Sequence, residues 1–276
     1  MIVTVAEKAG ACYGVNRALE LALGCQGAPQ PVHTLGPLIH NPLVVASLAE
    51  QGVFEAADLD EAGSGTVVIR SHGTGPQLIE QAVQRGFNLV DATCPFVSKV
   101  QQHAVELGRQ GYAVVIVGEA GHAEVEGIRA WGGSAVLAVV EEPGELPAEL
   151  PPKVGVVVQT TQSEERYQRV LAALEERCEE VRAFKTICSA TQKRQQAAAE
   201  LAAASDVMVV IGGRNSGNTR RLVEVCQASC PTYHVESAAE LQPEWFAPHS
   251  RVGVTAGAST PQAHIDAVTA ALEELA

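Results

Sequence analysis

Short, continuous apolar runs recur along the chain, and each ends in a loop of Gly, Ser, Thr or His that leads into a helical pattern. Strands that are apolar on both faces and alternate with helices are typical of parallel sheets covered on both sides. The sequence therefore predicts an α/β fold with mainly parallel sheets. The clearest runs are residues 66–70, 113–117, 154–158, 206–211 and 251–254. The predicted helices are residues 15–25, 95–110, 163–178, 190–204, 217–228 and 261–275.

A loose internal repeat divides the chain into thirds, each of which opens near a cysteine and supplies two strand–loop–helix units. We expect three pseudo-symmetric α/β units: residues 13–94, residues 95–187, and residues 188–276 together with 1–12. Ligands of open α/β sheets bind at the carboxyl ends of the strands. We therefore expect the polar loops of the three units to converge on one central cavity.

Composition excludes several classes of function. A formal net charge of -13 argues against binding to nucleic acid or to an anionic membrane surface, both of which need a basic face. No apolar run approaches the ~20 residues that span a bilayer. The N-terminus leads straight into a strand without a signal-peptide pattern, so we expect a cytoplasmic protein.

Three of the seven cysteines, Cys12, Cys94 and Cys188, lie between a strand-like run and a helical pattern. In a reducing compartment they are not expected to form disulfides. Three thiolates suit an iron–sulfur cluster with one open iron, whereas zinc with a histidine as fourth ligand and simple buried thiols are the alternatives. The residues alone leave all three open. The cysteines interpreted as structural are Cys25, Cys178, Cys226 and Cys230.

Two glycine-containing loops, residues 212–219 and 257–261, each follow an apolar run and open a helix. The first resembles a P-loop, but Asn218 stands where the phosphate-binding lysine belongs, which argues against ATP hydrolysis. Backbone amides at a helix N-terminus still bind phosphate without that lysine. A tight turn is the structural alternative for each loop, and the pair favours an anionic ligand.

Histidines stand in three further loops: His40, His72 and His122. They could donate to a diphosphate or carry protons near neutral pH. Glu124 lies in a small, apolar loop where burial would raise its pKa and make it a general acid. Glu126 is the competing carboxylate, and for both the alternative is a favourable charge in the first turn of a helix.

Together these stretches resemble the 4-hydroxy-3-methylbut-2-enyl diphosphate reductases, the iron–sulfur enzymes that end the methylerythritol phosphate route to isoprenoids. The resemblance covers nearly the whole chain. Its motifs are Gly10-Ala11-Cys12-Tyr13-Gly14-Val15, Ile39-His40-Asn41, Ser71-His72-Gly73, Asp91-Ala92-Thr93-Cys94-Pro95, residues 121–127, Gln159-Thr160-Thr161, Cys188, Asn215-Ser216-Gly217-Asn218 and Gly257-Ala258-Ser259.

The resemblance implies three α/β units around a central 4Fe-4S cluster, held by Cys12, Cys94 and Cys188, with one open iron for the substrate oxygen. It also implies that Glu124 relays protons, assisted by His122 and by the hydroxyl of Thr160. The residues that it assigns to the diphosphate substrate are His40, His72, His122, Thr160, Ser216, Gly217, Asn218 and Ser259.

Two positions depart from the family pattern. Gly217 replaces a second serine of the diphosphate loop, so that contact is left to backbone or water. Tyr13, beside the first cysteine, replaces a smaller residue. Neither departure touches an expected cluster ligand or the expected acid.

The resemblance implies reductive dehydroxylation of 4-hydroxy-3-methylbut-2-enyl diphosphate to isopentenyl and dimethylallyl diphosphates, with two electrons and two protons. Ferredoxin or flavodoxin is the implied electron donor. A zinc-dependent diphosphate-binding or metal-sensing protein and a zinc-dependent phosphoester hydrolase are the alternative functions. Neither alternative would need a reductant.

Overall fold

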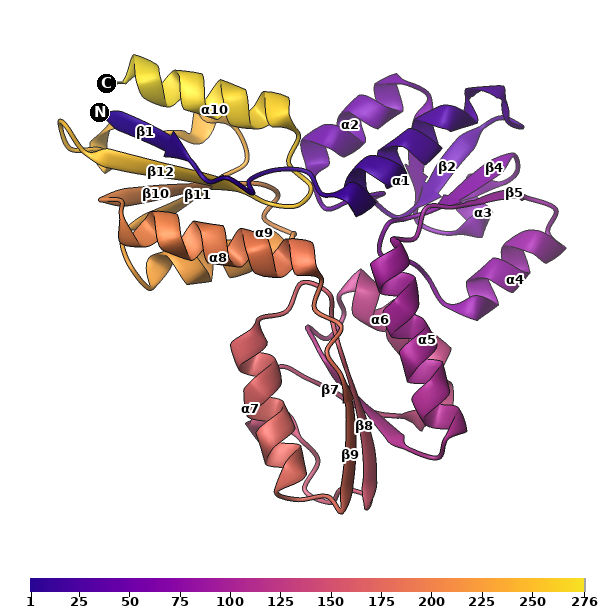
Figure 1. Cartoon of the computed structure of the whole chain (residues 1–276). Helices are drawn as coiled ribbons and strands as arrows, with labels where there is room; N and C mark the ends of the chain where they lie inside the picture. The colour runs from indigo at the N-terminus through magenta and orange to yellow at the C-terminus, as the bar shows by residue number, and fades with distance from the viewer. Residues whose placement is uncertain (276) are drawn as a thin grey trace. The chain divides into compact units, whose positions relative to one another are not determined.

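The computed structural model describes residues 1–275, and its strands form three four-stranded sheets in which every described pairing is parallel (Figure 1). The chain divides into two compact units. The first contains Met1–Val15, His40–Pro42 and the chain from Ser189 onwards. The second contains Asn16–Ile39 and Leu43–Cys188, and therefore holds two of the sheets.

One sheet of the second unit has the strand order β3-β2-β4-β5. Its strands are β2 (Val32–Leu35), β3 (Val53–Ala56), β4 (Thr66–Ile69) and β5 (Asn88–Asp91). The helices before and between these strands are α1 (Tyr13–Leu23), α2 (Pro42–Glu50), α3 (Leu59–Ala62) and α4 (Pro76–Gln84). Leu59 of α3 and Ala82 of α4 pack on Val67 and Ile69, so both helices bury apolar area against β4.

The other sheet of the second unit has the order β7-β6-β8-β9 and is covered on both faces. On β6, Val114 and Ile116 face α5 and α6, whereas Val115 and Val117 face α7, as the two-residue period of a strand requires. Its elements are α5 (Pro95–Arg109), β6 (Ala113–Val117), α6 (Ala123–Gly132), β7 (Val136–Val140), β8 (Lys153–Val158), α7 (Glu164–Glu175) and β9 (Glu180–Phe184).

The sheet of the first unit has the order β1-β12-β10-β11. Met208 and Val210 of β10 face α8 and α9, and the alternate residues of that strand face α10. Its elements are β1 (Ile2–Val5), α8 (Ser189–Ala203), β10 (Val207–Ile211), α9 (Gly217–Gln227), β11 (Thr232–Val235), β12 (Arg251–Ala256) and α10 (Gln262–Glu274).

All three sheets share one topology. Numbered along the chain, their strands lie in the order second, first, third, fourth, provided that β1 is counted as the fourth strand of the sheet in the first unit. β1 pairs with β12 in register, with Val3 beside Val252. One sheet thus falls in each predicted segment, and residues 1–12 supply the strand that the last segment lacks. The segment boundaries themselves stay a prediction.

The predicted α/β fold is confirmed, and the five apolar runs are the strands β4, β6, β8, β10 and β12. The predicted helices are found, with ends displaced by at most three residues. The largest displacement is at the end of α7, which ends at Glu175 instead of residue 178. Both ends of α1 are displaced by two residues, since it begins at Tyr13 and gives way after Leu23 to a 3-10 turn. The 3-10 turns are Gly24–Gly27, Gly133–Ala135, Pro143–Glu145, Ala238–Glu240 and Pro243–Trp245.

No helix within residues 1–275 combines the length and the apolar character that crossing a membrane needs.

Gly155 tests how tightly β8 packs on α5. A Cβ atom at Gly155 would lie 2.6 Å from a methyl carbon of Leu107, whose side chain is fully buried. We expect Gly155→Ala to lower the free energy of unfolding by about 1–3 kcal/mol, because the core there cannot expand freely. Gly144→Ala is the control, since nothing lies within 4 Å of its added methyl group. Chemical denaturation measures both, and equal midpoints for the two variants would contradict this packing.

Candidate active site

The polar loops leave each sheet where the strand order reverses. The first and third strands of each sheet lie side by side, and the chain leaves them toward opposite edges of the sheet. In open α/β sheets such a divergence of connections forms a crevice at the carboxyl ends of the two strands. In the first unit these loops follow β10 and β12. In the two sheets of the second unit they follow β2 and β4, and β6 and β8. The end of the loop after β2, His40–Pro42, belongs to the first unit. Every predicted site residue outside the cysteines lies in one of these loops or in the helix turn that follows it.

Glu124 and Thr160 meet at the crevice between β6 and β8. Glu124 lies in the first turn of α6 and is only 2% exposed. The backbone N–H of Thr160 donates to Oε1 of Glu124 at 2.6 Å, and the Thr160 hydroxyl donates to Oε2 at 2.8 Å. Both carboxylate oxygens are therefore held by one residue, which fixes the orientation of the acid.

Burial raises the pKa of Glu124 from 4.5 to about 7. Removal from water disfavours the charged carboxylate, while the two hydrogen bonds from Thr160 act in the opposite direction and leave a net rise. A carboxyl group with this pKa exists in both protonation states near neutral pH, which is what a general acid needs. Glu126 is exposed, accepts from the N–H of Gly121 at 3.3 Å and pairs with Arg129 at 3.9 Å, so it lacks this environment.

His122 caps the N-terminus of α6. Its Nδ1 accepts a hydrogen bond from the backbone N–H of Glu124 at 3.1 Å, so the neutral ring carries its proton on Nε2. The ring of His72, from the loop after β4, meets the His122 ring edge-on, with 5.7 Å between the centroids. The structure thus brings His72, His122, Glu124 and Thr160 together in the second unit.

Two of the predicted cluster ligands are tied by their backbone to these loops. The N–H of Cys188 donates to the carbonyl of Thr160 at 3.0 Å, and the N–H of Cys94 donates to the carbonyl of Ser71 at 2.9 Å. Thr160 therefore connects the buried acid to Cys188. Ser71, next to His72, is itself held by its hydroxyl, which donates to the carbonyl of Leu38 at 3.0 Å.

The three predicted ligands share one local position, directly before a helix. Cys12 directly precedes α1, Cys94 directly precedes α5, and Cys188 directly precedes α8. All three side chains are partly exposed. The donor set therefore fits an iron–sulfur cluster with three cysteine ligands.

The other cysteines are structural, as predicted. Cys226 lies on α9 and is fully buried against α8, and burial raises its pKa to about 12, so it stays a thiol. Cys230 packs against the same cluster of apolar residues, and Cys178 packs against the core beneath α7. Cys25 is buried, and its thiol donates to the carbonyl of Leu21.

The assembly of the three ligands stays a prediction. Cys12 belongs to the first unit, whereas Cys94 and Cys188 belong to the second. Within residues 1–275, no group of three His, Cys, Asp or Glu side chains is arranged to hold a single metal ion.

The first unit places the remaining predicted residues at the crevice between β10 and β12. Ser216 caps α9, and its hydroxyl oxygen accepts from the N–H of Thr219 at 3.3 Å. The side-chain amide of Asn218 is buried, and among the described residues neither its nitrogen nor its oxygen has a hydrogen-bond partner. An amide buried in this way costs free energy unless a ligand satisfies it.

Ser259 joins the loop after β12 to the segment that contains His40. The Ser259 hydroxyl donates to the carbonyl of His40 at 3.1 Å, and the side chain of Asn41 donates to the carbonyl of Ser259 at 2.9 Å. Asn41 was not among the predicted site residues. Its position next to His40 in the Ile39-His40-Asn41 motif could have identified it. The same segment packs closely on Gly213, where a Cβ atom would lie 2.6 Å from the His40 carbonyl oxygen.

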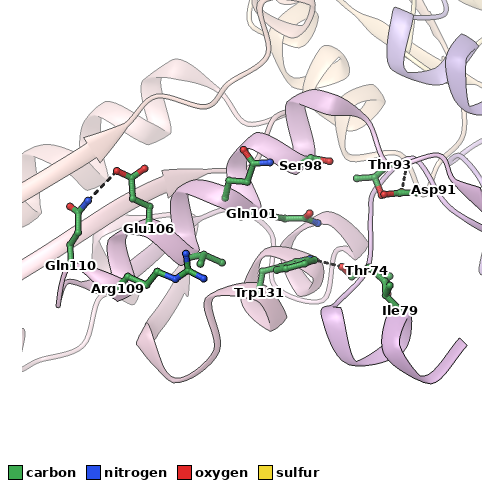
Figure 2. A pocket seen from close by; sticks show the side chains of 12 residues that line it. Thr74, Ile79, Asp91, Thr93, Ser98, Gln101, Glu106, Arg109, Gln110 and Trp131 are labelled. Atoms are coloured by element: carbon green, nitrogen blue, oxygen red, sulfur yellow. Dashed lines mark hydrogen bonds between the residues drawn. The ribbon is translucent and has the colours of Figure 1, made fainter. Parts of the chain in front are cut away.

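A separate cavity of about 540 Å³ lies beside α5 and α6 in the second unit (Figure 2). Trp131 forms part of its wall and donates from its indole nitrogen to the carbonyl of Thr74 at 2.9 Å, and the buried side chain of Gln101 also lines it. None of the predicted site residues lines this cavity.

Comparisons with known proteins agree with one another along the full chain. A family model described as "LytB protein" matches residues 3–273. The 4-hydroxy-3-methylbut-2-enyl diphosphate reductase of Pelobacter propionicus is 49% identical over 278 residues, covering 100% of this chain and 99% of that protein. The enzyme of the same name from Geotalea uraniireducens is 47% identical over 278 residues, with 100% and 98% covered.

Two solved structures are also similar. One, titled as (E)-4-hydroxy-3-methyl-but-2-enyl diphosphate reductase, the terminal enzyme of the non-mevalonate pathway, is 43% identical with a TM-score of 0.71, covering 99% of this chain and 100% of that chain. The other, E-1-hydroxy-2-methyl-but-2-enyl-4-diphosphate reductase from Plasmodium falciparum, is 25% identical with a TM-score of 0.90, covering 99% and 87%.

The raised pKa of Glu124 makes stability depend on pH. The folded protein binds the proton of this carboxyl group more tightly than the unfolded chain does, so its contribution to stability falls as pH rises from about 4.5 to about 7. We expect Glu124→Gln to become more stable relative to the unsubstituted protein over this range, by on the order of 3 kcal/mol. Urea unfolding at several pH values measures the difference. Parallel pH profiles for the two proteins would show that Glu124 ionises normally.

Proposed function

The chain belongs to the LytB protein family, and we propose the following roles for its residues in the reduction of 4-hydroxy-3-methylbut-2-enyl diphosphate. The protein is an oxidoreductase of this family. The substrate loses its allylic hydroxyl group as water and takes up two electrons and two protons. The products are isopentenyl diphosphate and dimethylallyl diphosphate.

The buried carboxyl group of Glu124 carries the proposal. Its pKa of about 7 keeps a proton available near neutral pH, and Thr160 holds both of its oxygens. When Glu124 is protonated, it can donate to the Thr160 hydroxyl, which can in turn donate to the departing substrate oxygen. His122, held by the N–H of Glu124, would support proton supply from its Nε2 side.

We propose that Cys12, Cys94 and Cys188 hold a 4Fe-4S cluster. Their shared position before a helix and the backbone bonds of Cys94 and Cys188 to the site loops support this assignment. When bound, the cluster supplies the electrons at an iron without a cysteine ligand. We further propose that ferredoxin or flavodoxin reduces it and that the protein works in the cytoplasm, where thiols stay reduced.

We propose that the diphosphate group binds at the N-terminus of α9. Backbone N–H groups and the helix dipole favour an anion there, and the buried amide of Asn218 offers a donor that the described residues leave unused. Ser216, Ser259 and His40 would add contacts from the same unit. His72, His122, Thr160 and the backbone of Gly217 stay predicted contacts of the substrate.

Anaerobic purification tests the proposed cluster. We expect a brown protein with about four irons and four sulfides per chain, because a complete cubane contains both. Substituting Cys12, Cys94 or Cys188 with serine should remove most of the iron and sulfide. Cys178→Ser is the matched control and should keep both. Bound zinc without sulfide would contradict the proposal and favour a zinc-dependent diphosphate-binding protein or hydrolase.

Glu124→Gln tests the proposed acid. The amide keeps the shape of the side chain and can still pair with Thr160, but it has no acidic proton. We expect turnover with a reduced electron donor to fall about 10²–10⁴-fold while the KM for substrate changes little. Glu126→Gln is the control, since this exposed neighbour should be dispensable. Full turnover by the Glu124→Gln holoenzyme would remove Glu124 from this role.

A further inference from the structure

The hydroxyl group of Thr186 joins the connection after β9 to the end of β8, the neighbouring strand of the same sheet (Figure 1). It accepts a hydrogen bond from the N–H of Val158 at 2.8 Å and donates to the carbonyl of the same residue at 2.5 Å. Val158 is the last residue of β8 and is fully buried. Thr186 lies between Phe184, where β9 ends, and the proposed ligand Cys188.

These two bonds continue the ladder between β8 and β9 by means of a side chain. The N–H of Gln159 donates to the carbonyl of Val117 on β6 at 2.9 Å, and successive residues of a strand direct their backbone groups to opposite edges. The backbone groups of Val158 therefore face β9. In a regular parallel ladder, a backbone N–H of the neighbouring strand would donate to the Val158 carbonyl. The Thr186 hydroxyl donates to it instead, so the backbone of the connection can leave the sheet.

The same connection is held at two further places. The side chain of Ile187 is 7% exposed and packs in the core that also contains Val158. The N–H of Cys188 donates to the carbonyl of Thr160 at 3.0 Å. The bond of Thr186 and the bond of Cys188 are separated by two residues on each segment, as successive bonds of a parallel ladder are.

The Thr186 hydroxyl gives this attachment its direction. Apolar packing such as that of Ile187 is non-directional, whereas a hydrogen bond weakens steeply when its angle or distance changes. The carbonyl of Val158 loses a donor if the hydroxyl is removed, and a buried acceptor without its partner costs free energy. The position of Cys188 along β8 therefore depends in part on the hydroxyl of Thr186.

A displacement of this connection would also reach the proposed acid. Thr160 accepts from the N–H of Cys188, and it donates from its own N–H and from its hydroxyl to the two carboxylate oxygens of Glu124. The contacts thus run from the Thr186 hydroxyl, through the end of β8, to a proposed cluster ligand and to the proposed acid. All of these residues belong to the second unit.

We propose that Thr186 is a positioning residue for the reaction: its hydroxyl fixes the connection after β9 and thereby sets the backbone of Cys188 and the contacts of Thr160 with Glu124. The inference rests on the proposed roles of Cys188 and Glu124. Thr186 acts through Val158, and its hydroxyl rather than its methyl group carries the effect. Variants that keep or remove the hydroxyl therefore separate positioning from simple packing.

The test compares Thr186→Val, which keeps the shape of the side chain but lacks the hydroxyl, with Thr186→Ser, which keeps the hydroxyl but lacks the methyl group. Thr232→Val is the matched control. Thr232 is also partly exposed, and its hydroxyl donates to the backbone carbonyl of Cys230 at 3.0 Å, but it lies on β11 in the first unit.

Three quantities are measured on the anaerobically purified holoproteins. They are the hydrogen exchange of the N–H groups of Thr160 and Cys188, the rate at which a chelator removes iron, and the values of kcat and KM with a reduced electron donor. Neither N–H group is bonded to Thr186 itself, so a change in their exchange reports a change of position.

For Thr186→Val we expect both N–H groups to exchange about tenfold faster, as the loss of a nearby hydrogen bond would cause. Iron should be released faster, and kcat should fall about tenfold with little change in KM, because a misplaced group costs rate rather than binding. Thr186→Ser should match the unsubstituted protein in all three measurements, and Thr232→Val should change none of them.

Unchanged exchange or unchanged iron release in Thr186→Val would overturn the inference. Equal effects in Thr186→Ser would assign them to packing, and equal effects in Thr232→Val would assign them to general destabilisation, so either result would also overturn it. If Thr186→Val does not fold, Thr186→Ala is measured instead, because alanine also lacks the hydroxyl. An unsubstituted protein without iron and sulfide would refute the proposed function, and the exchange rates would then still decide whether Thr186 holds the backbone of Cys188.

Discussion

Parallel pairing of the strands governs how the three sheets are connected and where their loops lie. Each connection between parallel neighbours must cross a face of the sheet, so helices cover both faces and every strand ends at the same edge. The shared order of second, first, third, fourth strand makes the connections diverge between the first and third strands. In all three sheets the polar loops therefore follow the carboxyl ends of the first and third strands. These strands are β2 and β4, β6 and β8, and β10 and β12.

The loop after β8 shows how the residues at the carboxyl end of a strand fix the position of a buried acid. Thr160 donates twice to Glu124 and accepts from the backbone of Cys188, so one residue holds the buried acid and the backbone of a proposed ligand. Burial makes the carboxyl group a weak acid, and the two bonds keep it from becoming weaker still. The loop after β12 likewise holds two segments: the carbonyl of Ala258 accepts from the N–H of Cys12, and the hydroxyl of Ser259 donates to the carbonyl of His40.

The strands that the sequence predicted and those that it missed differ in burial. The runs that became β4, β6, β8, β10 and β12 lie inside their sheets and are apolar on both faces. Strands at the sheet edges, such as β3 and β11, are partly exposed and mix polar with apolar residues, so they lack a continuous run. β2 is internal, but two of its four residues, His33 and Thr34, are polar, so it has no apolar run that would predict a strand.

Short, contiguous patterns in the sequence predict the α/β class, the interior strands, the loops that carry the proposed site residues, and the family. The packing of the folded chain encloses Glu124, rather than Glu126, and places both of its carboxylate oxygens against Thr160. It alone paired β1 with β12 and set the Thr186 hydroxyl against Val158. The physical reason is that a pKa, a strand partner or a buried hydrogen bond depends on atoms far away in the chain, which meet only when the cores pack.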